Sequence, residues 1–499
     1  MAEGKDLNLD EIKKYVSNTD RDIYTVSNLP EEVVAVIFAY VSRSPKGFRD
    51  NIGTVIKEEQ FGQERAAKFH EKWVLNYGHA SVAEHAAVHI GIERVSRLFS
   101  SLLELSNEYL SFTEYSQRYQ KPQKGDFYVP DELNEKPSLL SEYIELNDYL
   151  YDTYVQINDK LYDFLKRSIP IPQGGEEKAH LRALEKIAFE DARYALSLAT
   201  YTNLGITANA RAIEDTLTKL LSSKYKEARK RAEEIKQEVR FSVPTLLKYA
   251  NKNKYIKETG EELERIARSI LIPQQESKTG SGVKLLDWVG KGLSNPEESA
   301  IDKMVMGILF EHSDLSYQEI EREIDRRDWK SKLIVLKKAI EKLGKHDNPM
   351  NVFKLINYEA EFVISEACWH QLLRHRKVNW ITQEPSVSNG ITMPPNVEQA
   401  GAEELLREAT LKSEELYGKL MNENLTEIAP YVVTNAHNRR VIGSFDLWEL
   451  YHLTNLRMSE GAQWDIKNIV GILAKEISKY HPNLVAPALR RVEVVNPME

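Results

Sequence analysis

The sequence predicts an α+β protein in which helices pack on a small sheet in each of two tandem domains. Its 499 residues are enough for two domains or more, since one domain takes roughly 100–200 residues. Hydrophobic residues make up 42% and charged residues 29%, a balance typical of globular domains. The stretch at 273–283 is polar and has linker composition. We therefore predict domains at 1–272 and 284–499, joined by this linker.

Landmark residues recur in the same order in the two predicted domains, although few other positions match. Glu190 and Asn209 are 19 positions apart in the first domain, and Glu427 and Asp446 have the same spacing in the second. Ordered recurrence of this kind indicates a repeated unit. The sequence therefore suggests a diverged tandem duplication.

Hydrophobic periodicity places the elements of the first domain. Apolar and polar residues alternate over 87–93, which predicts a strand. The next segments predict a helix at 96–110 and an extended return at 112–119. Periodicity near 3.6 residues predicts further helices at 138–167, 176–200 and 207–239.

The second domain repeats this pattern. Segment 358–363 resembles the strand of the first domain, and 365–373 predicts a helix that leads into a basic turn. Further helices are predicted at 405–422, 445–456 and 462–479.

Charge and composition exclude several classes of function. The formal net charge is −9, so the surface as a whole does not favour nucleic acid or acidic membranes, and an anion site must be a local pocket. No apolar run reaches the roughly 18 residues of a membrane span, and no signal peptide is expected. The one cysteine, Cys368, excludes internal disulfides and suggests a reducing cytoplasm. Walker A, GxGxxG and GxSxG motifs do not occur.

Two short motifs look like parts of one anion site. The second domain carries Gln371, Arg374, His375 and Arg376 as QxxRHR, and the first carries SQRY at 116–119. The planar fork of an arginine guanidinium matches the oxygens of a phosphate. Taken alone, RHR fits a solvated basic turn or an ion-pair site better than an anion site, and SQRY fits an ordinary strand with exposed polar residues equally well.

These motifs, with GHASVAEH at 78–85, resemble the signature of the flavin-dependent thymidylate synthases. The resemblance extends to ExxR at 190–193, NAR at 209–211, LR at 456–457 and AQWDI at 462–466. It implies two tandem thymidylate-synthase-complementing-like domains. It also implies the reductive methylation of dUMP to dTMP, with FAD as redox cofactor, NADPH as reductant and methylenetetrahydrofolate as carbon donor.

Each domain departs from the family pattern where the other domain keeps it. The first reads Ser106-Asn107-Glu108 at the RHR position and Leu220 at the LR arginine, and the second has Glu384, Ser386 and Pro430 in place of the signature serine and two arginines. Family members are homotetramers with active sites built between subunits. We therefore expect one complete composite site from first-half and second-half residues, in a homodimer acting as a pseudo-tetramer with two live and two degenerate sites.

The resemblance assigns roles to individual residues. Arg457 is the expected catalytic residue, placed beside the uracil. The expected substrate-binding residues are Gln371, Arg374, Glu114, Ser116, Gln117, Arg118 and Arg193. The expected cofactor-binding residues are His79, Ser81, Glu84, Asn209, Arg211, Arg374, His375, Arg376 and His452. No metal is expected, because His85 and His89 are four positions apart but have no evident third ligand.

Simpler interpretations of these residues stay open. His79, His85 and His452 can be hydrogen-bonded core histidines, Glu190 and Arg193 a surface helix pair, and Asn209 a helix cap. Cys368 lies in an apolar helical stretch and fits core packing better than a nucleophile. The alternatives for the whole chain are a flavoenzyme acting on another pyrimidine nucleotide, and a catalytically inactive nucleotide-binding scaffold.

Overall fold

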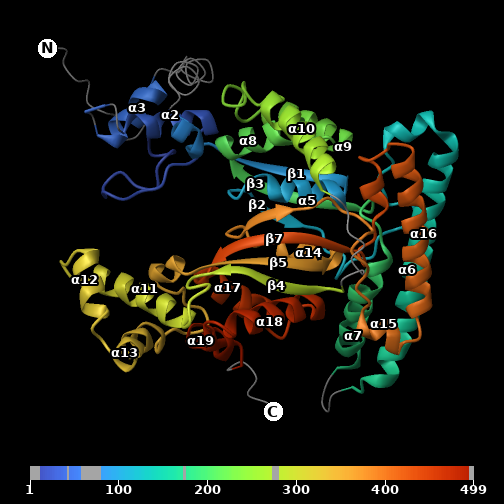
Figure 1. The fold of residues 1–499 in the computed structure, drawn as a ribbon. Coiled ribbons are helices and arrows are strands. Elements are labelled where there is room, and N and C mark those ends of the chain that lie inside the picture. The colour runs from blue at the N-terminus through green and yellow to red at the C-terminus, as the bar shows by residue number, and fades with distance from the viewer. Residues whose placement is uncertain are drawn as a thin grey trace. The chain divides into compact units, whose positions relative to one another are not determined.

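The computed structural model describes residues 12–41, 44–45, 47–57, 80–171, 176–271 and 280–493. It contains helices and small antiparallel sheets, as predicted (Figure 1). The chain divides into two compact units. The first unit comprises Met1–Ser116, Tyr128–Glu132 and Thr200–Gln274, and the second comprises Gln117–Phe127, Leu133–Ala199 and Gln275–Glu499. The second unit thus combines stretches from both halves of the sequence, while the boundary between two sequence repeats stays a prediction.

The sheet of the first unit has the strand order β1-β3-β2 and is antiparallel throughout. It consists of β1 (Ala87–Ser96), β2 (Ser111–Glu114) and β3 (Tyr201–Asn209). The predicted strand at 87–93 is confirmed. The extended return predicted at 112–119 is a strand only as far as Glu114.

The helix predicted at 207–239 is wrong at its start and is interrupted in the middle. Tyr201–Asn209 is the strand β3, where Leu204, Ile206 and Ala208 are buried at a spacing of two. The Asn209 side chain then accepts a hydrogen bond from the Ala212 amide and begins α8 (Ala210–Leu221). A second helix, α9 (Lys226–Val239), follows.

The other helices of the first unit are α2 (Glu31–Tyr40), α3 (Phe48–Lys57), α5 (Arg97–Ser106) and α10 (Lys254–Ile270). The helix predicted at 96–110 is confirmed for α5. It begins at Ser96, whose hydroxyl accepts a hydrogen bond from the Phe99 amide, and it ends at Ser106, earlier than predicted.

The sheet of the second unit has the order β4-β5-β7-β6 and is also antiparallel. It consists of β4 (Gly282–Trp288), β5 (Asn357–Ser365), β6 (Asn379–Thr382) and β7 (Asn438–Asp446). The strand predicted at 358–363 is confirmed. β4 begins inside the predicted linker, and the linker residues up to 279 lie outside the described part of the chain.

The long helices of the second unit include the predicted ones at 138–167, 405–422 and 462–479, which are confirmed as α6 (Pro137–Ser168), α16 (Glu403–Asn422) and α18 (Trp464–Ser478). Two other predicted helices have different bounds and are α7 (Glu177–Ala192) and α17 (Leu447–Arg457). The helix predicted at 365–373 is confirmed as α14 (Glu366–Leu372). The remaining helices are α11 (Pro296–Glu311), α12 (Tyr317–Ile324), α13 (Trp329–Ile340), α15 (Pro395–Gln399) and α19 (Pro482–Glu493).

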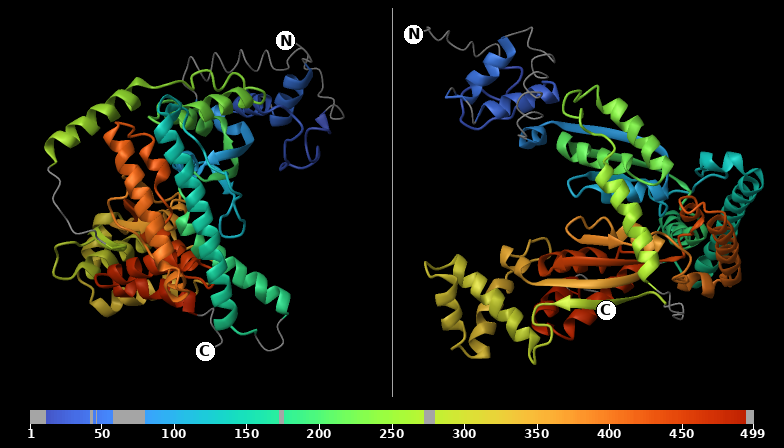
Figure 2. Two further views of the ribbon diagram at one scale, coloured as in Figure 1. Left: turned by 90° about the vertical axis from the view of Figure 1, so that its right-hand side faces the viewer. Right: turned by 45° about the horizontal axis from the view of Figure 1, so that its top comes forward.

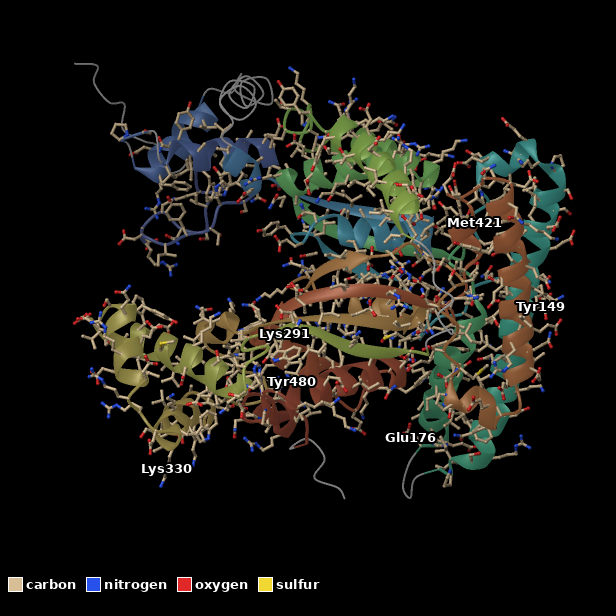
Figure 3. The ribbon with its side chains drawn as sticks, viewed as in Figure 1. Tyr149, Glu176, Lys291, Lys330, Met421 and Tyr480 are labelled. Atoms are coloured by element: carbon tan, nitrogen blue, oxygen red, sulfur yellow. The ribbon has the colours of Figure 1, made fainter. Side chains whose placement is uncertain are left out.

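Helices of both sequence halves share one hydrophobic core in the second unit. α6 and α16 run side by side in two views (Figure 2). Leu161 of α6, Leu184 of α7 and Leu406 of α16 are buried in the same cluster. At the surface of this pair, the Lys412 ammonium lies 5.0 Å from the ring centroid of Tyr149, which Figure 3 labels on α6.

Two segments at matching positions of the predicted repeats pair with each other inside the second unit. Ser197 and Thr434 form an antiparallel bridge, and they are separated by the same sequence distance as Glu190 and Glu427. The Leu198 amide donates to the Val433 carbonyl at 2.8 Å. Pairing of this kind is what a local twofold axis between the predicted repeats would produce.

The strand orders also fit the predicted duplication, because β1, β3 and β2 follow the same spatial order as β5, β7 and β6. None of the helices in the described ranges combines the length and apolar character that crossing a membrane requires.

Candidate functional site

The basic turn lies at the C-terminal end of α14 in the second unit. Ser365 caps this helix by accepting a hydrogen bond from the Cys368 amide. Gln371 is buried on its last turn, and its side-chain amide donates to Gln463 Oε1 at 3.2 Å. Arg374 follows the helix, and its Nε donates to the His370 carbonyl at 3.1 Å. The cap and the short helix therefore fix where the basic turn begins.

Arg457, at the end of α17, is held against this turn by two hydrogen bonds. Its Nε donates to His375 Nε2 at 2.8 Å, and its Nη2 donates to the Gln371 carbonyl at 2.9 Å. The pKa of Arg457 is lowered to about 10, first because the guanidinium is buried and then because Arg374 and Arg118 repel its charge. A bound anion would relieve this crowding of positive charge.

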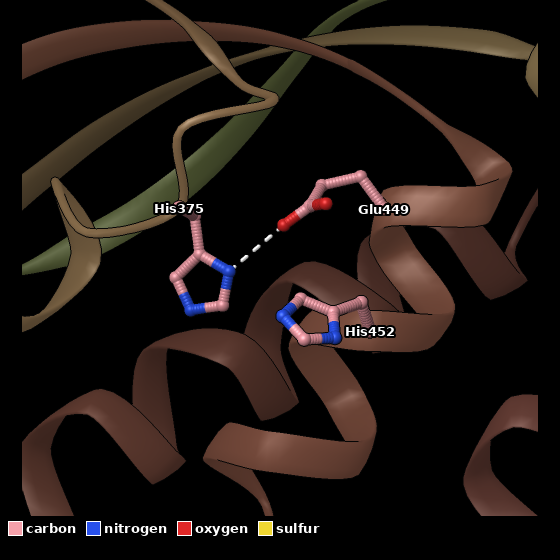
Figure 4. A group of neighbouring side chains, drawn as sticks. All are labelled: His375, Glu449 and His452. Atoms are coloured by element: carbon pink, nitrogen blue, oxygen red, sulfur yellow. Dashed lines mark hydrogen bonds and ion pairs between the residues drawn. The ribbon is translucent and has the colours of Figure 1, made fainter. Parts of the chain in front are cut away.

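His375 is buried between Arg457 and Glu449. Figure 4 shows its contact with Glu449. His375 Nδ1 lies 2.8 Å from Glu449 Oε1. Burial, together with the charge of Arg457, lowers the pKa of His375 to about 3, so the ring is neutral at neutral pH. Burial also raises the pKa of Glu449 to about 7.

Arg118 and Arg193 come from the first half of the sequence, yet they lie in the same unit as the basic turn. Arg118 Nε donates to Glu190 Oε2 at 2.7 Å, and its Nη2 donates to the Gly461 carbonyl at 3.4 Å. Arg193 is buried, and its Nε donates to the Glu190 carbonyl at 3.2 Å. The loop after α17 therefore meets first-half residues within one chain.

Asn435 ties the same first-half segments to the second half. Its side-chain amide donates to Gln117 Oε1 at 3.1 Å and to the Arg193 carbonyl at 2.9 Å. Asn435 is buried and lies in the segment that pairs with residues 194–199. The local twofold pairing therefore also positions Gln117 and Arg193.

A buried carboxylate completes the link between the halves. Asp465 Oδ2 accepts hydrogen bonds from the Tyr194 hydroxyl at 2.7 Å and from the Ser365 hydroxyl at 2.5 Å. Gln463 Nε2 also donates to the Tyr194 hydroxyl at 3.1 Å. Burial raises the pKa of Asp465, which its hydrogen bonds partly offset. This network joins the end of α7 to the starts of α14 and α18.

The sequence did not single out Glu449, Asn435 or Tyr194. Glu449 and His452 are three positions apart, a spacing that places both on one face of a helix. This spacing, close to the LR motif, is the sequence signal that could have identified Glu449. Asn435 and Tyr194 carry no local signal, because their role depends on the pairing of distant segments.

Glu114 and Ser116, predicted to bind substrate, lie in the first unit. Glu114 is buried, and its Oε1 lies 2.6 Å from Arg97 Nη1 and accepts from the Ser100 hydroxyl at 2.8 Å. This carboxylate therefore balances a buried arginine of α5. Ser116 is the last residue of its segment in this unit.

Three predicted cofactor-binding residues of the first unit line one cavity of about 390 Å³. Its lining includes Glu84, Asn209 and Arg211. Arg211 Nη1 lies 2.5 Å from Glu84 Oε1, and both side chains are about half exposed. The volume lies within the range of ligand sites, roughly 300–1,000 Å³. Ser81, three positions before Glu84, is exposed. His79 lies outside the described residues.

The other predicted cofactor-binding residues, Arg374, His375, Arg376 and His452, lie in the second unit. Ligating atoms of His375, Glu449 and His452 all fall within 4.8 Å of one another, which raises the question of a metal site. Arg457 only donates, so His375 Nε2 is its acceptor, and the ring proton sits on Nδ1 facing Glu449. In this tautomer His375 offers no lone pair to a metal ion.

Comparison with known proteins finds matches along most of the chain. The family model described as "Thymidylate synthase complementing protein" matches residues 24–245 and 301–483. A UPF0159 protein from Chlamydia muridarum is 24% identical over 499 residues, covering 94% of this chain and 92% of the relative. One from Thermoplasma acidophilum is 24% identical over 478 residues, covering 89% and 93%.

Shorter matches reach proteins with a named activity. A flavin-dependent thymidylate synthase from Clostridium tetani is 29% identical over 225 residues, covering 44% of this chain and 82% of that protein. Among solved structures, thymidylate synthase X from Helicobacter pylori with FAD and dUMP is 16% identical, with a TM-score of 0.31, and the match covers 42% of this chain and 100% of that one.

Proposed function

Because this chain belongs to the thymidylate synthase complementing protein family, we propose that it is a flavin-dependent thymidylate synthase. The reaction is the reductive methylation of dUMP to dTMP, with methylenetetrahydrofolate as carbon donor and NADPH as reductant. The observation that carries the proposal is the cluster formed by Arg118, Arg193, Arg374 and Arg457 in one unit of one chain. The sequence halves contribute two arginines each, so neither half has this cluster by itself.

The arginine cluster suits the phosphate of a nucleotide. Glu190 holds both guanidinium groups in place, because its carboxylate accepts from Arg118 Nε and its backbone carbonyl accepts from Arg193 Nε. A phosphate dianion would bring negative charge to the cluster and accept several charge-assisted hydrogen bonds. Gln371 adjoins this cluster, and Gln371 and Arg374 are proposed to bind the same nucleotide.

Arg457 is proposed to act on the uracil ring. A fixed cation at the ring edge stabilises negative charge that develops on the carbonyl oxygens when the C5=C6 bond is activated. Cys368 is buried, and burial raises the pKa of its thiol well above the usual range. A thiol that stays protonated is a poor nucleophile, which supports a flavin route rather than attack by cysteine.

FAD, when bound, supplies the redox chemistry. In the first unit, Glu84, Asn209 and Arg211 are proposed to bind it, since their cavity offers a guanidinium and amide groups suited to phosphate and hydroxyl oxygens. In the second unit, the proposed cofactor-binding residues are Arg374, His375, Arg376 and His452. Ser81 and His79 complete the proposed set by resemblance.

The chain is proposed to act as a homodimer of tandem thymidylate-synthase-complementing-like domains, equivalent to a tetramer of single domains. The pairing of Ser197 with Thr434 supports this, because it reproduces a twofold interface inside one chain. The degenerate positions offer no cation to a second nucleotide and are Ser106, Leu220, Glu384, Ser386 and Pro430. We propose a cytoplasmic protein whose partners are the nucleotide and folate rather than nucleic acid or membrane.

Turnover and stoichiometry test the proposal. Purified protein should show flavin absorbance and should form dTMP from dUMP when NADPH and methylenetetrahydrofolate are added. Calorimetric titration with dUMP should give one site per chain. Absence of dTMP with dUMP bound would favour action on another pyrimidine nucleotide or an inactive binding protein, and absence of both binding and turnover would refute the proposal.

A further inference from the structure

We propose that Glu449 and His375 form a relay that locks the Arg457 guanidinium in the orientation needed by the nucleotide. Glu449 and His375 are positioning residues in this relay, since they act through Arg457. The inference rests on the proposed function for the identity of the nucleotide. The relay itself is a property of the protein without ligand.

The first step is the position of one proton. Arg457 Nε carries a hydrogen and has no acceptor atom, so the 2.8 Å contact requires a lone pair on His375 Nε2. A neutral imidazole with a lone pair on Nε2 carries its proton on Nδ1. That proton points at Glu449 Oε1, 2.8 Å away. The glutamate therefore selects the tautomer that can accept from the arginine.

The second step is the orientation of the guanidinium. Nε is fixed by His375 and Nη2 by the Gln371 carbonyl, so two bonds from one rigid turn define the plane of the group. These bonds use two of the five N–H groups that an arginine offers. The remaining N–H groups keep a defined direction for a ligand.

The third step is why the lock needs a hydrogen-bond acceptor at position 449. His375 and Glu449 are 3% and 2% exposed, so water does not readily replace a lost partner. If Glu449 were replaced by an apolar residue, the Nδ1 proton of His375 would lose its buried acceptor, and a shift of that proton to Nε2 would break the bond from Arg457. A buried contact in which the N–H groups of His375 and Arg457 face each other is strongly unfavourable.

The backbone supports the relay from α17. The Asp446 side chain caps this helix by accepting from the Glu449 amide at 2.8 Å, which fixes the turn that carries the carboxylate. Arg457 lies at the far end of the same helix. The relay thus spans one helix and joins it to the basic turn through His375.

A test without substrate reads the proton directly. Nitrogen NMR of histidine-labelled full-length protein, with the His375 signal assigned from the His375→Gln variant, should show a neutral ring protonated on Nδ1 from pH 5 to pH 8. In Glu449→Leu the ring should lose this single tautomer, whereas Glu449→Gln should keep it through its amide oxygen. A ring protonated on Nε2, or charged at pH 6, in the wild-type protein would overturn the relay.

A second test measures the consequence for binding by calorimetry with dUMP and the FAD-loaded protein. His375→Leu should weaken binding roughly 10- to 100-fold, the range expected when an arginine loses one hydrogen-bond acceptor. His375→Gln should recover most of the affinity, because its amide oxygen can accept from Arg457 Nε. His481→Gln serves as the control, since His481 is also buried but bonds to Tyr358 and the Val289 carbonyl.

The outcomes separate the two proposals. Wild-type protein that fails to bind dUMP refutes the proposed function, and the NMR measurement still decides the relay. Wild-type binding that His375→Leu and Glu449→Leu leave unchanged refutes the relay and leaves the proposed function standing. Equal losses in His375→Leu, His375→Gln and His481→Gln indicate a general structural effect and also refute the relay.

Discussion

Replacing Arg118 by alanine removes a cation from the proposed phosphate site and also leaves Glu190 without its partner. The loss of one charge-assisted hydrogen bond weakens binding by about 1.5–3 kcal/mol. Without the Arg118 guanidinium between them, the Glu190 carboxylate and the substrate phosphate repel each other. For unit charges about 6 Å apart, this repulsion is about 3 kcal/mol at an effective dielectric constant of about 20. The Arg118 and Glu190 side chains are 20% and 15% exposed, so screening by water reduces this second contribution.

Together these effects predict that the Kd for dUMP rises by about 100- to 1,000-fold in Arg118→Ala. The assay is calorimetric titration of the FAD-loaded protein. Flavin absorbance should stay unchanged, since Arg118 is not among the proposed cofactor-binding residues. The loss of one partly exposed ion pair should cost about 1 kcal/mol of stability or less, so unfolding does not account for the result.

The double variant Arg118→Ala/Glu190→Gln separates the two contributions. Removing the glutamate charge should recover about tenfold of the lost affinity, because the repulsion disappears while the missing contact stays missing. Wild-type affinity in Arg118→Ala would refute the assignment of this residue to the nucleotide. An affinity in the double variant no better than in the single one would refute the role given to Glu190.

Three further predictions concern the surroundings of the site. Tyr194→Phe removes one of the hydroxyl donors to the buried Asp465 and should lower the free energy of unfolding by about 1–3 kcal/mol in urea titrations; an unchanged midpoint would contradict the network. Glu449 has a folded-state pKa raised to about 7, so the unfolded chain releases this proton first and the contribution of Glu449 to stability falls as pH rises from about 4.5 to about 7. The stability of wild type relative to Glu449→Gln should therefore drop across that window by at most about 3 kcal/mol, and a rise would contradict the raised pKa. Cys368→Ala should keep dTMP formation within about threefold of wild type, because the buried thiol is not a nucleophile, and abolished turnover in a folded variant would count against the flavin route.

Periodicity predicts the long helices and the strands at 87–93 and 358–363, and it misses other strands. The helix at 138–167 has a repeating apolar face over many turns, and the structure extends it by only one residue at each end. Tyr201–Asn209 is short and lies directly before α8, and the helix predicted at 207–239 includes its last three residues. β4 contains Gly282 next to a polar stretch, and its strand character depends on pairing with β5.

Local sequence motifs likewise predict only part of the candidate site. The motifs identify Arg374 and Arg457 because each stands in a recognisable local pattern. Long-range pairing decides which first-half residues lie beside them. The hydrogen bond from Arg118 to the Gly461 carbonyl, for example, has no local sequence signature. Glu449 went unnoticed because a buried carboxylate on a helix looks, in sequence, like any solvated glutamate.

The bridge between Ser197 and Thr434 has a consequence for how this protein can change over generations. In an assembly of identical subunits, a substitution at the twofold axis changes the residue on both sides of the contact at once. The new side chain must then pack against a copy of itself. Here the two sides are encoded separately, and one already carries a methyl group that the other lacks. Under the proposed duplication, each repeat can therefore change separately, one toward binding an anion and the other toward supporting its neighbour.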